Sequence, residues 1–408
     1  MKKILSLILA LFLIFSLCIL SSCDSDTKGG VKTLYVYNWG EYISDGSEGS
    51  LDSNAAFEAW YFETYGERVK VNYSTYSSNE DMYAKLSGGA VSYDVIVPSD
   101  YMIERLIKED MLAPLNFENI PNVANLRPEF YGAEANFDYY DEGSVYSVPY
   151  FYGMIGIIYN TAMVDEEDIG SWDLMWNEKY KGNILQFNNS RDAFGTAQYF
   201  LGIDVNTDDV DEWRAALELL KSQKDIVQGY VMDEIFNKME NGSAAIAAYY
   251  AGDFLTMYEN NEDLDFFYPE EGTNLYVDAM CIPKTSENKL LAERYINFML
   301  SEEPAIANAE YTYYASPNRL VVESEEYREY MSEIKDDAFE KMYATDVTAT
   351  YYENLTTEKL ALINTLWEEL KSDIEVSPTI IILCVIIVGA LAGMGLFFGI
   401  RKRYRNHY

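Results

Sequence analysis

The stretch that decides the fold contains TLYVYNW at positions 33–39, VKVNY at 69–73 and DVIV at 94–97. Residues 33–37 and 69–73 alternate their apolar side chains and 94–97 is a short apolar run, so these three segments are predicted to be strands. Residues 54–65 and 79–87, which lie between these strands, place apolar and aromatic side chains at helical spacing. The order strand, helix, strand, helix, strand is typical of βαβ units, and it predicts a parallel α/β sheet.

The rest of the chain continues this alternation. The apolar run 147–160, which contains Pro149, Gly153 and Gly156, is interpreted as a buried crossing between two lobes. Further strands are predicted at 182–187, 244–250 and 276–282, and further helices at 211–224, 233–240, 292–300 and 358–372. The simplest architecture is a pair of α/β lobes joined by more than one crossing.

Composition excludes several classes of function. The 408 residues carry 67 Asp and Glu against 30 Lys and Arg, a formal net charge of −37. Charge of this sign repels nucleic acid, which is not expected as a partner, and it concentrates cationic ligands near the surface. The single histidine, His407, is the penultimate residue. Enzymes that need an internal histidine, such as those with a Ser/His/Asp triad, are therefore excluded.

The N-terminus has the pattern of an export signal. Lys2 and Lys3 precede an apolar run at 4–20, and the segment Leu20-Ser21-Ser22-Cys23 follows, which resembles the lipobox of bacterial lipoproteins. We expect residues 1–22 to be a lipoprotein signal peptide, Cys23 to be the lipidated residue, and 23–30 to be a polar tether. The alternative is a plain signal anchor with a cysteine there by chance.

The C-terminus has the pattern of a membrane span. Residues 379–400 carry no charge and are long enough to cross about 30 Å of hydrocarbon. The basic tail 401–408 follows at once, and the positive residues at both ends place the region between them on the extracytoplasmic side. We therefore predict an ectodomain at the cell membrane, anchored by lipid and by a single C-terminal transmembrane helix.

Cysteine placement agrees with this topology. Cys18 and Cys384 lie in the two apolar segments, and Cys23 is the expected lipid site. Only Cys281 remains in the ectodomain, which therefore has no internal disulfide. Because Cys281 lies in the apolar, strand-like run 276–282, it is predicted to be a buried, unreactive thiol.

Side chains suited to binding follow the predicted strands. In a parallel α/β sheet, ligands bind beyond the carboxyl ends of the strands, where the segments 38–42 and 98–101 combine aromatic rings with hydrogen-bond acceptors. Segments of the same character recur at 189–192, 249–250, 276–278 and 313–314. Aromatic faces attract ammonium groups and carboxylates pair with them. Sugar sites use the same residue types, so composition alone leaves an organic cation and a sugar both open.

Three blocks in order carry a resemblance to a known family. They are YVYNWGEY at 35–42, YSTY at 73–76 with NEDMYAKL at 79–86, and YDVIVPS at 93–99. These blocks resemble the spermidine/putrescine-binding proteins of bacterial polyamine ABC transporters, and the similarity extends over roughly residues 31–373.

The resemblance implies a two-lobed, type II periplasmic-binding-protein fold that closes on a polyamine by a hinge motion. It implies no catalysis and no cofactor, a monomeric ectodomain, and a permease with its ATPase as partners. The lobes are expected to comprise 31–147 with 277–315, and 148–276 with 316–373.

The resemblance also implies a set of ligand-binding residues. They are Trp39, Glu41, Tyr42, Ser99, Tyr101, Asn189, Asp192, Tyr249, Tyr276, Asp278 and Tyr314. The chain departs from the family pattern at Gly40, which replaces a hydroxyl residue, at Asn189, which replaces an acid, and at Tyr249 and Tyr276, which replace tryptophans. Because the acid is missing at Asn189, putrescine and spermidine both stay open as ligands.

The sequence also allows three other functions to be weighed. The first is binding of another solute on the same scaffold, such as an oligosaccharide or an amino acid derivative. The second is a surface glycosidase, which needs two carboxylates about 5–9.5 Å apart across a sugar cleft. The third is a sensor, for which the eight residues after Ile400 leave no room for a signalling domain.

Overall fold

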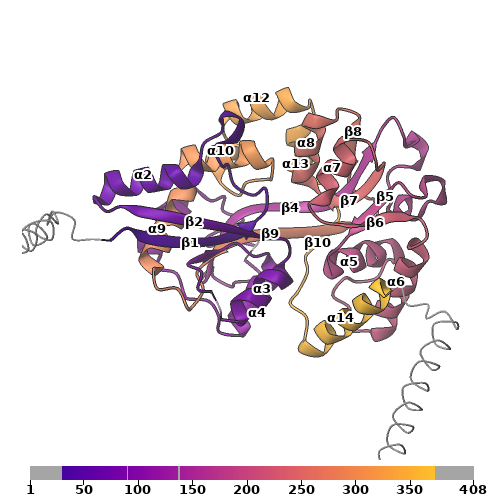
Figure 1. The fold of residues 1–408 in the computed structure, drawn as a ribbon, viewed down its shortest axis with the longest axis horizontal. Helices are drawn as coiled ribbons and strands as arrows, with labels where there is room; N and C mark the ends of the chain where they lie inside the picture. Colours follow the sequence, from indigo (N-terminus) through magenta and orange to yellow (C-terminus); the bar gives the residue numbers. More distant parts are fainter. Residues whose placement is uncertain (1–29, 90, 137, 373–408) are drawn as a thin grey trace, which may run out of the picture.

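The computed structural model of the chain describes residues 30–89, 91–136 and 138–372 (Figure 1). The predicted signal peptide, the lipid site Cys23 and the predicted membrane helix at 379–400 lie outside these residues. Among the helices of the described ranges, none combines the length and the apolar content that crossing a membrane requires.

The described residues form a mixed sheet of ten strands. Its main order is β2-β1-β3-β9-β4-β7-β5-β6, with β10 beside β9 and β8 beside β4. The strands are β1 (Lys32–Trp39), β2 (Val69–Tyr76), β3 (Val95–Ile96), β4 (Ser147–Asn160), β5 (Ile184–Phe187), β6 (Val227–Val231), β7 (Ile246–Tyr250), β8 (Leu264–Phe267), β9 (Thr273–Cys281) and β10 (Ala349–Thr350). Short 3-10 helices in the connections are η1 (Ser47–Gly49), η2 (Phe117–Asn119), η3 (Pro121–Asn125), η4 (Glu166–Asp168), η5 (Trp172–Trp176) and η6 (Glu178–Tyr180).

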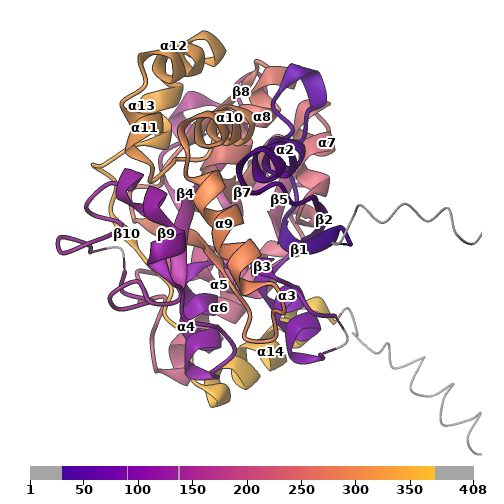
Figure 2. The ribbon, with the colours of Figure 1, turned by 90° about the vertical axis from the view of Figure 1, so that its left-hand side faces the viewer.

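One half of the sheet, which we call the first lobe, is built around three parallel strands. β1 pairs in parallel with both β2 and β3, as the alternating pattern predicted. The helices of this lobe are α2 (Ser53–Tyr65), α3 (Asn79–Ser87), α4 (Asp100–Lys108), α9 (Lys289–Met299) and α10 (Glu302–Thr312). Figure 2 shows α2 and α10 on one face of the sheet and α3 and α4 on the other.

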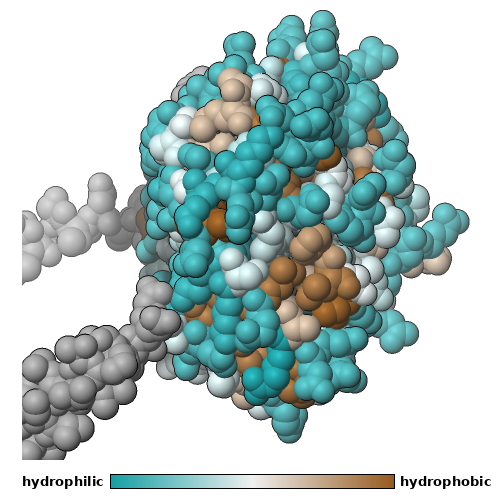
Figure 3. Space-filling model, turned by 90° about the vertical axis from the view of Figure 1, so that its right-hand side faces the viewer, coloured by the Kyte–Doolittle hydropathy of each residue, from teal (hydrophilic) through white to brown (hydrophobic). Residues whose placement is uncertain are grey.

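The other half, the second lobe, repeats this plan. β5 pairs in parallel with β6 and with β7. Its helices are α5 (Ser190–Leu201), α6 (Val210–Gln223), α7 (Glu234–Glu240), α8 (Ala251–Asn260), α11 (Arg319–Val322), α12 (Glu325–Ile334), α13 (Ala338–Met342) and α14 (Thr357–Lys371). The outer face of this lobe is mostly hydrophilic, with one larger apolar group near the centre of the view and smaller apolar spots around it (Figure 3). Leu201 and Val210 are among the exposed apolar residues of the lobe.

Two long strands cross between the lobes. β4 pairs with β9 over its first part and with β7 and β8 over its last part, and Figure 1 shows both β4 and β9 running across the middle of the molecule. Thirteen of the fourteen residues of β4 are buried, which explains why its sequence is apolar throughout. The expected lobe boundaries at 147/148 and 276/277 fall within these continuous strands, and the assignment of segments to lobes stays a prediction.

The core surrounds the sheet and continues between helices. Trp172 and Trp213 are fully buried, and a separate apolar cluster joins α5, α6 and α14 through residues such as Phe194, Leu217 and Leu366. Cys281 is fully buried, and burial raises its thiol pKa well above the usual value. The prediction of an inert thiol at this position is therefore confirmed.

A short segment near the C-terminus touches both lobes before α14 begins. We call residues 349–356 the strap. Tyr351 stacks on Tyr139 with ring centroids 3.8 Å apart, and the backbone N–H of Asn354 donates to Glu104 of α4 at 2.8 Å. These contacts tie the strap to the first lobe.

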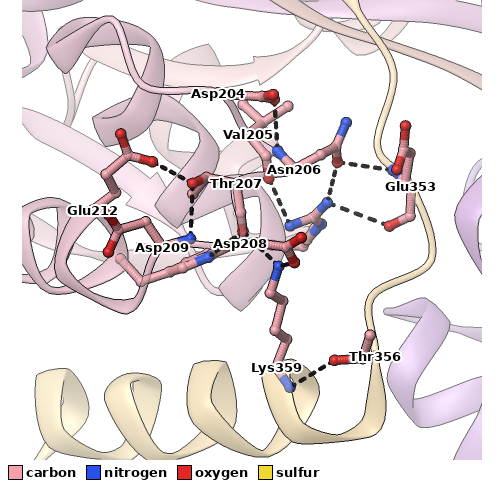
Figure 4. Close-up of polar contacts among 12 residues, drawn as sticks. Asp204, Val205, Asn206, Thr207, Asp208, Asp209, Glu212, Glu353, Thr356 and Lys359 are labelled. Carbon is pink, nitrogen blue, oxygen red and sulfur yellow. Dashed lines mark hydrogen bonds and ion pairs between the residues drawn. The ribbon is translucent and has the colours of Figure 1, made fainter.

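The helix that follows the strap is fixed to the second lobe. Lys359 donates to the carbonyl oxygen of Thr207 at 2.9 Å and forms an ion pair with Asp208. Glu353 donates its backbone N–H to Asn206 at 2.9 Å. Figure 4 shows these contacts between the two segments. The start of α14 is thus held by polar contacts, while its apolar face joins the core of the second lobe.

Candidate functional site

One cavity lies where the two lobes meet, with about 750 Å³ of empty space that opens partly to solvent. Its walls come from the segments that follow β1, β2 and β3 in the first lobe and β5, β6 and β7 in the second. The cavity therefore occupies the place that the topology of a parallel sheet favours for ligands. All of the predicted site residues line it: Trp39, Glu41, Tyr42, Ser99, Tyr101, Asn189, Asp192, Tyr249, Tyr276, Asp278 and Tyr314.

Asp278 lies on the crossing strand β9 and is 4% exposed. Its carboxylate accepts hydrogen bonds from the hydroxyls of Tyr42 and Ser99, each at 2.6 Å. Burial raises the pKa of Asp278 to about 6, and the two hydrogen bonds oppose that rise. Because both donors come from loops of the first lobe, this carboxylate is held rigidly against that lobe.

Asp192 is the corresponding acid of the second lobe. It lies in the first turn of α5, where it accepts hydrogen bonds from the Tyr250 hydroxyl at 2.7 Å and from the Asn189 amide at 2.9 Å. Burial raises its pKa to about 7. The Asn189 oxygen accepts the backbone N–H of Arg191 at 3.0 Å and so caps the helix. Both polar groups of Asn189 are therefore engaged within the protein.

Three further acids line the cavity that sequence reasoning did not select, namely Asp100, Asp233 and Asp253. Asp100 and Asp253 lie in the first turns of α4 and α8, where the helix dipole favours negative charge. Burial is the main cause that raises the pKa of Asp100 to about 7 and that of Asp253 to about 8. Asp100 and Asp253 could have been identified from the sequence, because each lies in the first turn of a helix that follows a strand of the sheet.

Aromatic rings form the remaining walls. Tyr42 packs edge-on against Tyr314, with ring centroids 4.7 Å apart, and Tyr250 packs edge-on against Tyr276 at 5.5 Å. Among the described residues, the buried hydroxyl of Tyr276 has no hydrogen-bond partner. Tyr249 lines the cavity but is 2% exposed, whereas its neighbour Tyr250 reaches Asp192. Tyr250 is thus an additional candidate that the sequence analysis noted without selecting.

Tyr352, which belongs to the strap and was not among the predicted site residues, lies in the cavity wall. Its hydroxyl is buried and has no hydrogen-bond partner within the described ranges. The guanidinium of Arg191 lies 4.4 Å from the centre of its ring. That guanidinium donates to the Val205 carbonyl oxygen at 3.0 Å and to Asn206 at 2.8 Å. Neither partner lines the cavity, so these hydrogen bonds lie outside it.

The charge of the cavity is one-sided. Six acids line it: Glu41, Asp100, Asp192, Asp233, Asp253 and Asp278. Among all the described residues of the lining, none is Lys or Arg. Across the described ranges, no group of three or more acidic, Cys or His side chains is arranged to hold a metal ion. Acids spread along a ring-lined cavity suit an elongated organic cation, whose charged groups are separated by apolar carbons.

Gly252 makes room for one wall of the site. A Cβ at this position would lie 2.3 Å from Cδ2 of Tyr314, so Gly252→Ala should displace that ring and weaken ligand binding about tenfold. Helix α8 should tolerate the change, because alanine favours a helix over glycine by about 1 kcal/mol. We expect calorimetry to show the weaker binding without a large fall in melting temperature. Gly229→Ala, which meets no atom within 4 Å, is the control, and unchanged binding in Gly252→Ala would remove Tyr314 from the site.

Comparison with known proteins gives a consistent set of relatives. The family described as bacterial extracellular solute-binding protein matches residues 55–339. The spermidine/putrescine-binding periplasmic protein of Escherichia coli is 33% identical over 290 residues, which are 70% of this chain and 78% of that protein. The putrescine-binding periplasmic protein PotF of the same organism is 28% identical over 305 residues, or 71% and 78% of the two chains.

Solved structures are similar over most of the chain. A structure described as a spermidine/putrescine ABC transporter from Listeria monocytogenes superposes with a TM-score of 0.71 at 34% identity, covering 83% of this chain and 99% of that one. The substrate-binding protein PotD of a spermidine/putrescine ABC transporter from Streptococcus pneumoniae gives a TM-score of 0.65 at 33% identity, with 83% and 98% covered. The lobes and crossing strands described above thus form a periplasmic-binding-protein fold.

Proposed function

Because this chain belongs to the family of bacterial extracellular solute-binding proteins, and within it to the spermidine/putrescine-binding proteins, we propose that it captures a polyamine outside the cytoplasm for an ABC transporter. It is a binding protein and not an enzyme. Its partners are the polyamine and the membrane subunits of the transporter with their ATPase. No cofactor is needed for such a role.

The observation that carries this proposal is the uncompensated negative charge of the cavity. Asp192 and Asp278 are buried in opposite lobes, and each is held by hydrogen bonds from neighbouring side chains. Burying a carboxylate costs free energy unless a cation pairs with it. A ligand with ammonium groups at both ends removes that cost in both lobes, while the rings between the acids cover its methylene carbons.

The same placement supports a type II closing mechanism. Ligand contacts from both lobes stabilise the arrangement in which the lobes are together, so the ligand shifts the population toward the closed form. β4 and β9 join the lobes, and bending of these strands is the proposed hinge. We expect the closed, monomeric ectodomain to be the form that meets the transporter.

The sequence also supports attachment to the cell membrane. Cys23 and residues 379–400 would provide two tethers, one at each end of the ectodomain. Attachment at both ends keeps the binding protein near its transporter and raises its effective concentration there.

Calorimetric titration of the full-length protein in detergent tests the proposal. We expect putrescine or spermidine to bind with micromolar or lower Kd, and a neutral oligosaccharide to give no heat of binding. The same titration with spermine shows how affinity varies with the number of ammonium groups. Heat from the oligosaccharide with none from any polyamine would overturn the polyamine assignment and favour a sugar on the same scaffold.

A further inference from the structure

One end of the first lobe carries apolar and aromatic side chains on its surface. Phe62 and Tyr65, in the C-terminal half of α2, are 45% and 39% exposed, and Leu290, at the start of α9, is 47% exposed. Leu290 lies four residues before Arg294 and therefore on the same face of α9. Figure 1 shows α2 beside β1 and β2 at the left end of the molecule. Exposed apolar groups that gather in one place mark an interaction surface, whereas single ones do not.

Two arginines join these side chains into one surface. The guanidinium of Arg294 lies 3.7 Å from the centre of the Tyr65 ring and donates to the hydroxyl of Tyr61 at 2.8 Å. The guanidinium of Arg68 lies 5.0 Å from the centre of the Phe62 ring. The surface thus combines rings with cations. We call its residues the end patch: Phe62, Tyr65, Arg68, Leu290 and Arg294.

The charge of the end patch differs from that of the chain as a whole, which carries 67 acids against 30 basic residues. Two nearby acids are each paired, Glu67 with Lys32 at 2.8 Å and Glu58 with Lys70 at 3.0 Å. Among the described residues, neither arginine of the end patch forms an ion pair. Both guanidiniums can therefore pair with an anionic partner.

The chain that leads into this end contains the predicted lipid site. Lys32, the first residue of β1, interacts electrostatically with Arg294. Eight residues separate Cys23 from Lys32, and an extended chain covers at most about 3.6 Å per residue. A lipid on Cys23 would therefore hold this end of the first lobe within about 32 Å of the membrane.

We propose that the end patch rests on the phospholipid surface of the membrane. Aromatic side chains, with Lys and Arg, are the residues that proteins place where lipid meets water. Phe62, Tyr65 and Leu290 enter the headgroup region, and the two guanidiniums pair with lipid phosphates. This inference uses the proposed membrane attachment but is independent of the ligand in the cavity.

The small size of the end patch favours a lipid surface over a second copy of this chain. A stable protein interface takes about 20–30 residues from each partner, far more than the end patch offers. A membrane that is held nearby by a tether needs only a weak additional contact, because the tether supplies a high effective concentration. The end patch is thus suited to supporting an anchor.

The proposed contact leaves the cavity accessible. Trp39, the last residue of β1, lines the cavity, whereas Lys32 begins the strand beside the end patch. These two residues are about 23 Å apart along a strand that rises about 3.3 Å per residue. Lipid at the end patch therefore does not cover the ligand-binding residues.

Oxidation of aromatic rings by hydroxyl radicals tests the contact in the full-length protein, reconstituted into vesicles of phosphatidylcholine and phosphatidylglycerol. Tyr351 is the internal reference, because it is 39% exposed, as Tyr65 is, and lies outside the end patch. We expect mass spectrometry to show Tyr65 oxidised at least about fivefold less than Tyr351 in the vesicles. Equal oxidation of the two tyrosines would overturn the inference.

Two variants with matched exposure extend the test. Phe62→Glu places a negative charge in the end patch, so Tyr65 should then be oxidised about as much as Tyr351. Val210→Glu changes a residue of the second lobe that is 46% exposed, and Tyr65 should stay protected. Circular dichroism with thermal unfolding checks that both variants are folded.

Two further results would overturn the lipid assignment. The first is protection of Tyr65 that persists in folded Phe62→Glu. The second is protection that disappears when the protein is diluted into excess lipid, which would indicate a second copy of the chain. Phe62 lies outside the cavity, so Phe62→Glu should bind spermidine as the unmodified chain does. The membrane contact and the proposed function can therefore fail separately.

Discussion

Asp278→Ala should lower polyamine affinity at least about hundredfold. Asp278 lines the cavity from the strand that joins the two lobes, and its carboxylate is oriented by the hydroxyls of Tyr42 and Ser99. Removing one member of a buried, hydrogen-bonded charge pair costs about 2–5 kcal/mol of binding free energy, and about 2.7 kcal/mol corresponds to a hundredfold change. Calorimetric titration with spermidine and putrescine measures the effect, which should be large for both ligands.

Two variants separate the charge from the shape of this side chain. Asp278→Asn keeps the size and one acceptor but removes the charge, so it should lose nearly as much affinity as the alanine variant. Asp94→Asn changes an acid that is 2% exposed, accepts hydrogen bonds from Tyr35 and Asn288, and lies outside the cavity. It should bind normally. A folded Asp278→Ala protein with unchanged affinity would place the ligand elsewhere.

Polyamine affinity should also fall steeply with acid, by at least about tenfold between pH 8 and pH 5.5. In the empty protein, the pKa values of Asp278, Asp192 and Asp253 are raised to about 6, 7 and 8. Each must lose its proton to pair with an ammonium group, and the ammonium groups themselves stay charged because their pKa values lie near 10. Binding at neutral pH should therefore release protons.

Proton release is measured by repeating the titration in buffers with different ionisation enthalpies. The apparent heat should vary with the buffer at pH 7 and vary little at pH 9, where these acids are already ionised. Asp278→Asn should release fewer protons than the unmodified chain. Affinity that is constant from pH 8 to pH 5.5 would show that these carboxylates are not the groups that pair with the ligand.

The stability of the empty protein should move in the opposite direction. A carboxyl group whose pKa is higher in the folded than in the unfolded chain binds more protons when folded, so the free energy of unfolding falls as pH rises from about 4 to 8. The empty protein should thus melt at a higher temperature at pH 5.5 than at pH 8. Added spermidine should reverse that order, because it stabilises the ionised carboxylates.

The local pattern was enough to predict most of the strands that build the site. The segments 33–37, 69–73 and 94–97 became β1, β2 and β3, and the parallel pairing inferred from their helical connections is present. The helices α4, α5, α8, α10 and α12 and the short helices α11 and α13 were not predicted. The buried residues of α10 are small or polar, such as Ala305 and Asn308, so its inward face carries no stripe of large apolar side chains to recognise in the sequence.

The sequence predicted the site residues that align with the family, but it missed several of the acids that give the cavity its negative charge. Family resemblance led to Asp192 and Asp278, which the structure brings into one cavity. Asp253 was missed because only the fold shows that the first turn of α8 faces the same space, and Asp233 because its position opposite Gly40 depends on how the lobes meet. Periodicity describes one helix or strand at a time, whereas the place of these two acids in the cavity depends on how several elements pack together.

The strap and α14 decide which part of the molecule bears a C-terminal attachment. The strap touches the first lobe through Tyr351 and Asn354, but α14, from which the chain continues past Ser372, is packed into the second lobe. An attachment beyond Ser372 would therefore act on the second lobe, whereas the proposed N-terminal tether leads into β1 of the first lobe. With each lobe attached at its own end, opening and closing would move Glu41, Tyr42 and Ser99 relative to Asp192, and the strap, which contacts both lobes, would limit that movement.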